Sequence, residues 1–209
     1  MAAGRMAIEG VQDFAAAYDE LDQLTIDDVE TEQQDLAGFY FNDFVPRLEA
    51  VRGVSVDVLD VASGLNPAAV YLQAAYLARN PLGIDEKALV TDAEDGSTWT
   101  EVHKAFHPIV RATADRLGFG DLYLIEPEAR TIVYSTDKRI DFATSLDSGA
   151  HSGTTLARLA TRVISSGEPG VVFGVDFTTY APGLDEPTAF AATPLYDDGS
   201  LVGVLAASL

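Results

Sequence analysis

The chain has 209 residues, of which 47% are hydrophobic, so it can bury a sizeable core and is not disordered over most of its length. The 33 acidic residues outnumber the 13 basic ones, and the formal net charge of −20 at pH 7 repels nucleic acids and anionic membrane surfaces. The absence of cysteine excludes disulfides and thiolate sites. No apolar run approaches the roughly 18 residues that span a bilayer, so we expect the chain as given to be soluble.

The final segment, residues 201–209, reads as a buried strand, and the sequence stops inside it without a polar tail. We therefore expect this chain to be one domain of a longer protein. Asp outnumbers Glu 21 to 12 and Arg outnumbers Lys 10 to 3, a bias that suits a strongly hydrated, salt-tolerant surface.

Residues 1–52 form a predicted amino-terminal helical segment. Val11, Phe14, Tyr18 and Leu21 recur at helical spacing, which predicts two helices or one interrupted helix between positions 10 and 50. We expect this stripe to fold back on the rest of the chain or to pair with a second copy. The 11 acidic residues between Arg5 and Arg47 are read either as a solvated helix face or as a docking surface. Their mutual repulsion predicts a weak homodimer that salt promotes.

The remaining residues, 53–209, form the predicted main domain. A β-branched alternation over residues 53–60 predicts a short strand. Asn66 and Pro67 open a predicted helix over residues 68–79, and Ser97 caps another over residues 97–117, which Gly118 ends.

From position 121 the hydrophobic period becomes that of strands. Strands are predicted over residues 121–126, 131–136, 170–180, 188–195 and 201–208, with one helix over residues 154–165. The order β-β-α-β-β-β predicts an α+β fold, in which a single helix crosses a five-stranded antiparallel sheet.

This order and several short stretches resemble PAS/Cache-like sensor domains of bacterial adenylate or guanylate cyclases and methyl-accepting chemotaxis proteins. The resemblance extends from about position 38 to the end, and is carried by Tyr71–Gln73, Asn80–Pro81, Val102–Pro108, Arg111, Asp121–Ile125, Ile132–Tyr134, Lys138, Asp141–Phe142, Asp176–Pro182 and Ala189–Phe190. The family's usual Lys-Glu before Asp-Phe is replaced here by Lys138-Arg139-Ile140. The resemblance implies an extracytoplasmic domain of a longer membrane protein, with an attached output domain.

His103 and His107 are separated by four residues and share one helix face, the spacing of two zinc ligands. A third ligand is not apparent, because Glu101 points elsewhere on a helix and His151 lies in a predicted loop. Three interpretations remain open: a metal site, a packed pair of hydrogen-bonded histidines, or contact with a ligand.

Arg111 extends the same helix face and, with Lys138, is predicted to bind a carboxylate; the alternative is an internal ion pair with Asp121, Asp141 or Asp176. Strand alternation places Asp176, Thr178 and Tyr180 on one side of the sheet, where polar groups suit a small-molecule cavity; the alternative for Asp176 and Tyr180 is that their hydrogen bonds stabilise the turn and hairpin. The predicted ligand-binding residues are His103, His107, Arg111, Tyr123, Tyr134, Lys138, Asp141, Phe142, Asp176, Tyr180 and Phe190.

These features predict a ligand-binding sensor domain for a small anionic or zwitterionic molecule, without catalytic residues, metal or cofactor of its own. No nucleophile elbow, phosphate loop or dinucleotide fingerprint is present in the sequence. The alternatives are a metal-dependent hydrolase that uses His103 and His107, and a dimerisation module without a ligand.

Overall fold

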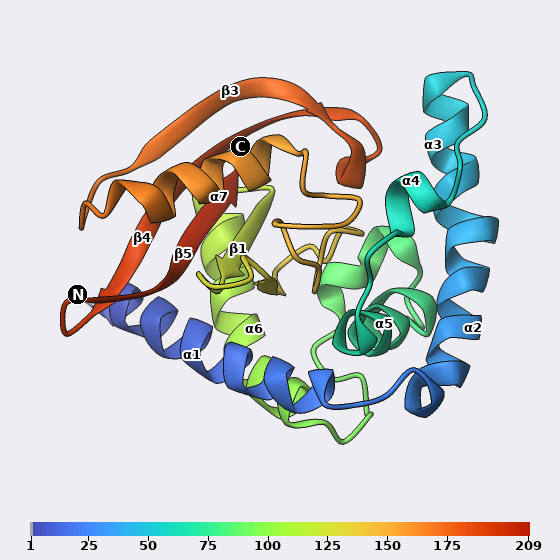
Figure 1. Cartoon of the computed structure of the whole chain (residues 1–209), viewed down its shortest axis with the longest axis horizontal. Helices are drawn as coiled ribbons and strands as arrows, with labels where there is room; N and C mark the ends of the chain where they lie inside the picture. The colour runs from blue at the N-terminus through green and yellow to red at the C-terminus, as the bar shows by residue number, and fades with distance from the viewer. Residues whose placement is uncertain (1) are drawn as a thin grey trace.

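The computed structural model describes residues 2–209, which form a helical layer and one antiparallel sheet (Figure 1). The helices that precede the sheet are α1 (Ala2–Asp22), η1 (Asp27–Val29), α2 (Glu30–Phe39), the π-helical turn η2 (Tyr40–Phe44), α3 (Val45–Arg52), α4 (Leu59–Ala62), α5 (Pro67–Gln73), the π-helical turn η3 (Ala74–Ala78), η4 (Ile84–Leu89) and α6 (Thr98–Leu117). The predicted caps are present: the side chains of Asn66 and Ser97 accept from the backbone N–H groups of Ala69 and Thr100.

The five strands are hydrogen-bonded in the order β2-β1-β5-β4-β3, and every pair is antiparallel. The elements are β1 (Asp121–Ile125), β2 (Ile132–Ser135), α7 (Thr155–Ser166), β3 (Phe173–Tyr180), η5 (Ala181–Gly183), β4 (Glu186–Asp197) and β5 (Ser200–Ser208). The predicted α+β fold with a five-stranded antiparallel sheet is therefore confirmed.

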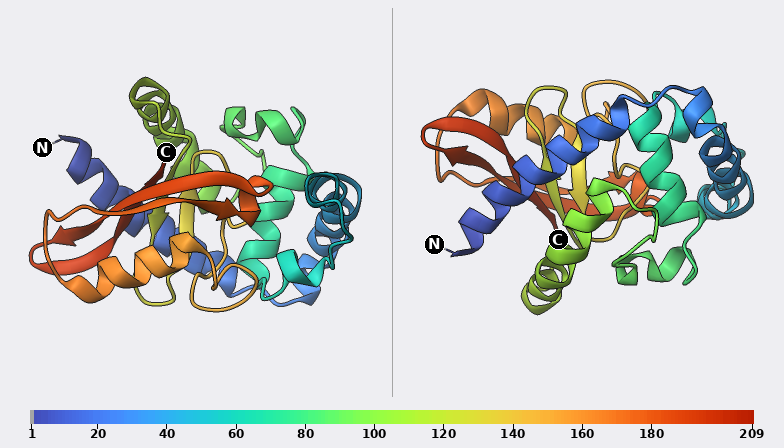
Figure 2. Two further views of the ribbon diagram at one scale, coloured as in Figure 1. Left: turned by 90° about the horizontal axis from the view of Figure 1, so that it is seen from above. Right: turned by 90° about the horizontal axis from the view of Figure 1, so that it is seen from below.

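Both faces of the sheet are covered, because its central strands carry apolar residues on alternate sides. On one face Leu122 and Leu124 pack in a core with α1, α5 and α6. On the other face Tyr123 and Ile125 pack against α7. Figure 2 shows α7 on one side of the sheet and α1 crossing the other. A third core, built from α2 to α5, lies beyond one end of the sheet.

The apolar stripe of α1 is covered by this protein's own chain. Val11 and Phe14 are fully buried, and Tyr18 is 6% exposed. The stripe therefore folds back and is not available as a dimer contact. The weak homodimer therefore remains a prediction. The buried stripe of α1 gives it no support.

The predicted strand over residues 53–60 is wrong. Gly53, in the left-handed region at φ 70°, ends α3, and Leu59 begins α4. Side chains satisfy the backbone donors between them: Glu49 accepts from the Val56 N–H and Asp57 accepts from the Leu59 N–H. Alternating apolar residues become a strand only where a neighbouring strand accepts those hydrogen bonds, and none is near enough to do so within the described chain.

Within residues 2–209, no helix has both the length and the apolar character that a bilayer crossing requires.

Replacing Phe14 by alanine tests the packing of α1. The Phe14 ring lies 5.1 Å from Trp99, 5.3 Å from Phe106 and 4.9 Å from Tyr134, measured between ring centroids. We expect Phe14→Ala to lower the free energy of unfolding by about 3–5 kcal/mol, because it leaves a cavity between α1, α6 and β2. Phe41→Ala is the matched control, since Phe41 is 61% exposed, and should change stability by no more than about 0.5 kcal/mol in urea titrations. Equal effects of the two substitutions would contradict this packing.

Candidate functional site

The loop between β2 and α7 carries several of the charged residues that were predicted to bind the ligand. A buried side chain from another part of the chain holds this loop in place. The buried Gln73 side chain donates from Nε2 to the carbonyl oxygens of Ile140 at 2.9 Å and Phe142 at 2.7 Å. The Tyr40 hydroxyl donates to the Oε1 atom of Gln73 at 2.9 Å. Gln73 thus joins α5 and the π-helical turn η2 to this loop. Residues 137–142 are held in place although they belong to neither a helix nor a strand.

A buried polar cluster, formed by Tyr123, Arg139, Asp141 and Tyr180, lies where this loop meets β1 and β3. The Tyr180 hydroxyl donates to Asp141 Oδ2 in a short hydrogen bond. Tyr123 Oη, Arg139 Nη1 and Asp141 Oδ1 are buried without a hydrogen-bond partner among the described residues. Buried polar atoms in proteins are nearly always satisfied, so these three neighbouring exceptions make the polar cluster the candidate site.

An aromatic wall bounds the polar cluster. The Phe190 ring of β4 lies 4.9 Å from the Tyr180 ring and 6.2 Å from the Tyr123 ring, between centroids. All three side chains are at most 1% exposed. A few polar groups within such an apolar lining are typical of small-molecule sites.

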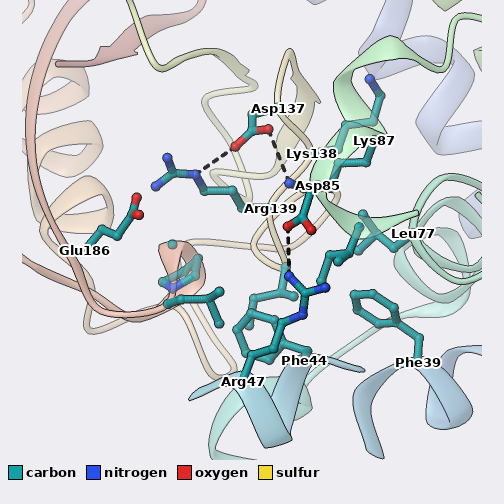
Figure 3. Close-up of a pocket in the computed structure, with 15 residues that line it drawn as sticks. Phe39, Phe44, Arg47, Leu77, Asp85, Lys87, Asp137, Lys138, Arg139 and Glu186 are labelled. Carbon is teal, nitrogen blue, oxygen red and sulfur yellow. Dashed lines mark hydrogen bonds and ion pairs between the residues drawn. The ribbon is translucent and has the colours of Figure 1, made fainter. Parts of the chain in front are cut away.

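Arg139 also lines an adjoining pocket of about 130 Å³, shown in Figure 3. The pocket lies between η2, α3, η4, the loop and η5, and its lining includes four of the chain's 13 basic residues: Arg47, Lys87, Lys138 and Arg139. Several of these cations are paired: Lys87 and Arg139 both contact Asp137, at 3.2 and 3.0 Å, and Arg47 contacts Asp85 at 2.8 Å. We call it the basic pocket.

Gly183 of η5 makes room for the Arg139 guanidinium. A Cβ atom at position 183 would collide with Arg139 Nη1. The next turn residue, Leu184, has a positive φ of 55°, and Asp185 follows at 61°. Asp185 is held by Arg52 of α3 through two hydrogen bonds of 2.6 and 2.9 Å. The β3–β4 turn is thus fastened over Arg139.

The electrostatics of the polar cluster are dominated by burial. Burial raises the pKa of the Asp141 carboxyl to about 6, although the Tyr180 hydrogen bond and the Arg139 charge act in the opposite direction. Burial likewise raises the pKa of the neighbouring Asp121 carboxyl to about 6. Asp121 nevertheless accepts hydrogen bonds from Ser135 and Thr136, so it stabilises the end of β2.

The histidine pair is packed and hydrogen-bonded. The rings of His103 and His107 stack at 4.3 Å between centroids, and both residues are fully buried. His107 contacts the Tyr134 hydroxyl and the Ala88 carbonyl, both at 2.8 Å, and His103 Nδ1 lies 2.9 Å from the Thr91 carbonyl oxygen. Burial, followed by the Lys138 charge, lowers the pKa of His107 to about 3.

These contacts occupy both ring nitrogens of His107, whereas His103 Nε2 has no hydrogen-bond partner among the described residues. Within residues 2–209, no group of three or more His, Asp or Glu side chains is arranged to hold a metal ion, so the hydrolase alternative lacks its third ligand there. Phe142 and Tyr134 belong to the same core as α6.

Lys138 and Asp141, both among the predicted ligand residues, lie beside different elements. Lys138 Nζ is 5.4 Å from the centroid of the Tyr76 ring in η3, whereas Asp141 bonds to Tyr180 in β3.

Two of the predicted ligand residues, Arg111 and Asp176, are at least partly exposed and lie away from the polar cluster. Arg111 is partly exposed on α6 and its nearest carboxylate is Asp115, at 3.9 Å, rather than any of the three aspartates expected as its alternative partners. Asp176 is exposed and accepts from the Phe177 N–H. A register shift in β3 between Val175 and Thr178 breaks the strand alternation, which is why Asp176 does not share the face of Tyr180.

Sequence reasoning missed Arg139, Asp137 and Gln73 as site residues. The only signal for Arg139 was its place between Lys138 and Asp141, where the resembled family has an acidic residue.

Among known proteins, similarity to this chain is found with a solved structure. No family model and no curated protein matches the chain. The sensor domain of the histidine kinase DctB from V. cholerae is similar over 87% of this chain, with 12% sequence identity and a TM-score of 0.37. This chain covers 55% of the length of that structure.

The raised pKa of Asp141 predicts a specific pH dependence. The native state holds this proton at a higher pH than the unfolded chain, whose aspartates titrate near 3.9. The contribution of Asp141 to stability is therefore lost as the pH rises from about 4 to about 6. Asp141→Asn keeps a neutral side chain of equal size. We expect the stability of the wild type relative to this variant to be about 2 kcal/mol higher at about pH 4.5 than at about pH 7.5.

Denaturant titrations at both pH values measure this difference. The exposed Asp176→Asn is the control and should show no comparable change. A relative stability of Asp141→Asn that does not vary with pH would show that Asp141 titrates as a free carboxyl.

Proposed function

We propose that this chain is the ligand-binding input domain of a signal-transduction protein and that its ligand is a small zwitterion. The observation that carries the proposal is the set of three buried atoms that have no hydrogen-bond partner in the described part of the chain: Tyr123 Oη, Arg139 Nη1 and Asp141 Oδ1. An unmade hydrogen bond at a buried polar atom costs about 1–3 kcal/mol, and more at a charged group. A ligand that supplies the missing partners recovers this free energy.

The charges of the polar cluster define the ligand. Arg139 donates from a guanidinium, which favours a carboxylate. Asp141 accepts through Oδ1, which favours an ammonium group. Burial keeps the pKa of Asp141 near 6, and a bound ammonium would stabilise its charged form and lower that pKa. A molecule with both groups on a short carbon frame therefore satisfies Arg139 and Asp141 together, and Tyr123 supplies a further hydrogen bond.

The aromatic rings beside the polar cluster limit the space for the rest of the ligand. Tyr180 and Phe190 line the polar cluster, and the β3–β4 turn covers Arg139. We propose that an output domain, attached in a longer membrane protein, reads the occupancy of this site. In that arrangement the domain lies on the extracytoplasmic side of the membrane.

Binding measurements on the wild type and matched variants test the proposal. Calorimetric titration with the common amino acids and with simple mono- and dicarboxylates should identify at least one zwitterionic ligand. We expect Arg139→Lys to weaken its binding at least about tenfold, since lysine cannot form the forked contact of a guanidinium with a carboxylate. Asp141→Asn should weaken ammonium-bearing ligands selectively.

Arg111→Lys is the control, because Arg111 lies outside the polar cluster, and it should leave the affinity unchanged. Circular dichroism confirms that each variant is folded. Loss of binding in Arg111→Lys, unchanged binding in Arg139→Lys, or no binding of any panel member by the wild type would each refute this site.

A further inference from the structure

The polar cluster is closed to solvent in this structure. Tyr123, Asp141 and Tyr180 are each at most 1% exposed. Arg139 belongs both to this cluster and to the lining of the basic pocket, and 14% of its side chain is exposed. A ligand can therefore enter only after part of the surroundings moves, and Arg139 marks the basic pocket as the adjoining open space.

The basic pocket is bounded by packed helices and by one short turn. The helical side is part of the third core, to which Phe44 and Leu77 belong. The other side is the β3–β4 turn, residues 181–185, whose middle three residues line the pocket shown in Figure 3. Leu184 packs against the third core but is only partly buried. The turn can therefore move at a lower cost than the helices, which carry that core.

The backbone of this turn is strained. Leu184 and Asp185 have positive φ values of 55° and 61°, and within residues 2–209 no other two consecutive non-glycine residues share this conformation. Left-handed backbone is unfavourable for residues that carry a Cβ atom, so it persists only where other contacts hold it. Within the turn, the Leu184 N–H donates to the Ala181 carbonyl at 3.0 Å and the Asp185 N–H donates to the Tyr180 carbonyl at 3.1 Å.

An ion pair ties the strained turn to a distant helix. Arg52 of α3 donates two hydrogen bonds to the Asp185 carboxylate, at 2.6 and 2.9 Å, from a position 133 residues earlier in the chain. Both side chains are partly exposed, so the pair can open without unpacking a core. Since α3 also supplies Arg47 to the basic pocket, this ion pair holds the turn against the helical side of that pocket.

We propose that the β3–β4 turn is a gate to the polar cluster and that the Arg52–Asp185 ion pair is its latch. When the pair opens, the strained turn relaxes, Gly183 moves away from the Arg139 guanidinium, and the basic pocket becomes continuous with the cluster. The movement also acts on the cluster through Tyr180, whose carbonyl accepts from the turn while its hydroxyl donates to Asp141. This inference rests on the proposed function, because the gate controls that ligand site.

Labelling with phenylglyoxal, which adds to accessible guanidinium groups, tests the gate without a ligand. The folded chain is treated briefly, digested and mapped by mass spectrometry, and the labelling of Arg139 is divided by that of Arg111 on α6. We expect Asp185→Asn to raise this ratio at least about threefold, because asparagine keeps the size and tolerates a positive φ but removes the charge. Gly183→Ala should also raise it, since a Cβ atom there would collide with Arg139 Nη1.

A matched substitution and a chemical cross-link serve as controls. Asp35→Asn breaks a different ion pair, with Arg79 at 2.7 Å, and should leave the ratio unchanged. Because the chain has no cysteine, a double variant with Arg52→Cys and Asp185→Cys can be joined by a short bis-maleimide at these two positions alone. The cross-link should return the labelling of Arg139 to the wild-type level, whereas a monofunctional maleimide should leave it raised.

The outcomes separate the gate from the ligand site. An unchanged ratio in Asp185→Asn, an equal increase in Asp35→Asn, or cross-linked protein labelled as strongly as its monofunctional control would each overturn the gate, even if Gly183→Ala failed to fold. None of these measurements uses a ligand. A failed gate therefore leaves calorimetric binding by the wild type intact, whereas a failed ligand site abolishes that binding and leaves the labelling pattern unchanged.

Discussion

The buried amide of Gln73 is the contact on which the arrangement of the polar cluster and the basic pocket depends. It satisfies the carbonyl oxygens of Ile140 and Phe142, and the Tyr40 hydroxyl in turn satisfies the amide. A loop without regular structure has no neighbouring strand or helical turn to donate hydrogen bonds to its carbonyl oxygens. The Gln73 amide supplies these donors, so the irregular loop can be buried and held rigid without leaving the two carbonyl oxygens unsatisfied. Tyr40 begins the π-helical turn Tyr40–Phe44, and Gln73 directly precedes the π-helical turn Ala74–Ala78. Such turns are frequent at functional sites.

The same loop directs two adjacent cations to different surroundings. Lys138 reaches the Tyr76 ring, whereas Arg139 reaches Asp137 and the β3–β4 turn. The difference decides their chemistry. A guanidinium stays charged even when it is buried and therefore recognises anions, whereas burial lowers the pKa of the Lys138 amine to about 7. Two positive charges in the sequence thus become two distinct functional groups.

The large negative charge of the chain makes these interior cations conspicuous. With 33 acidic residues and 13 basic ones, most cations are expected to pair with a nearby carboxylate, as Arg52, Arg79 and Lys104 do. Surface pairs of this kind contribute little to stability. Arg139 Nη1 and Asp141 Oδ1, which lack hydrogen-bond partners among the described residues, are instead buried next to apolar rings, where an unsatisfied polar atom is costly. These buried polar atoms are therefore better explained by a role in binding than by a contribution to stability.

The sequence by itself determined the fold class, the caps of Asn66 and Ser97 and the strand order along the chain. Hydrophobic period and capping are local signals, and they survive without knowledge of the fold. Only the tertiary structure decided that residues 53–60 form no strand, that the register shift in β3 exposes Asp176, and that Arg139 rather than Arg111 reaches the polar cluster. Each of these outcomes depends on residues that are distant in sequence. A strand needs a neighbouring strand, and a bulge is defined by the opposite strand. The effect of a charge depends on the groups that the fold packs against it.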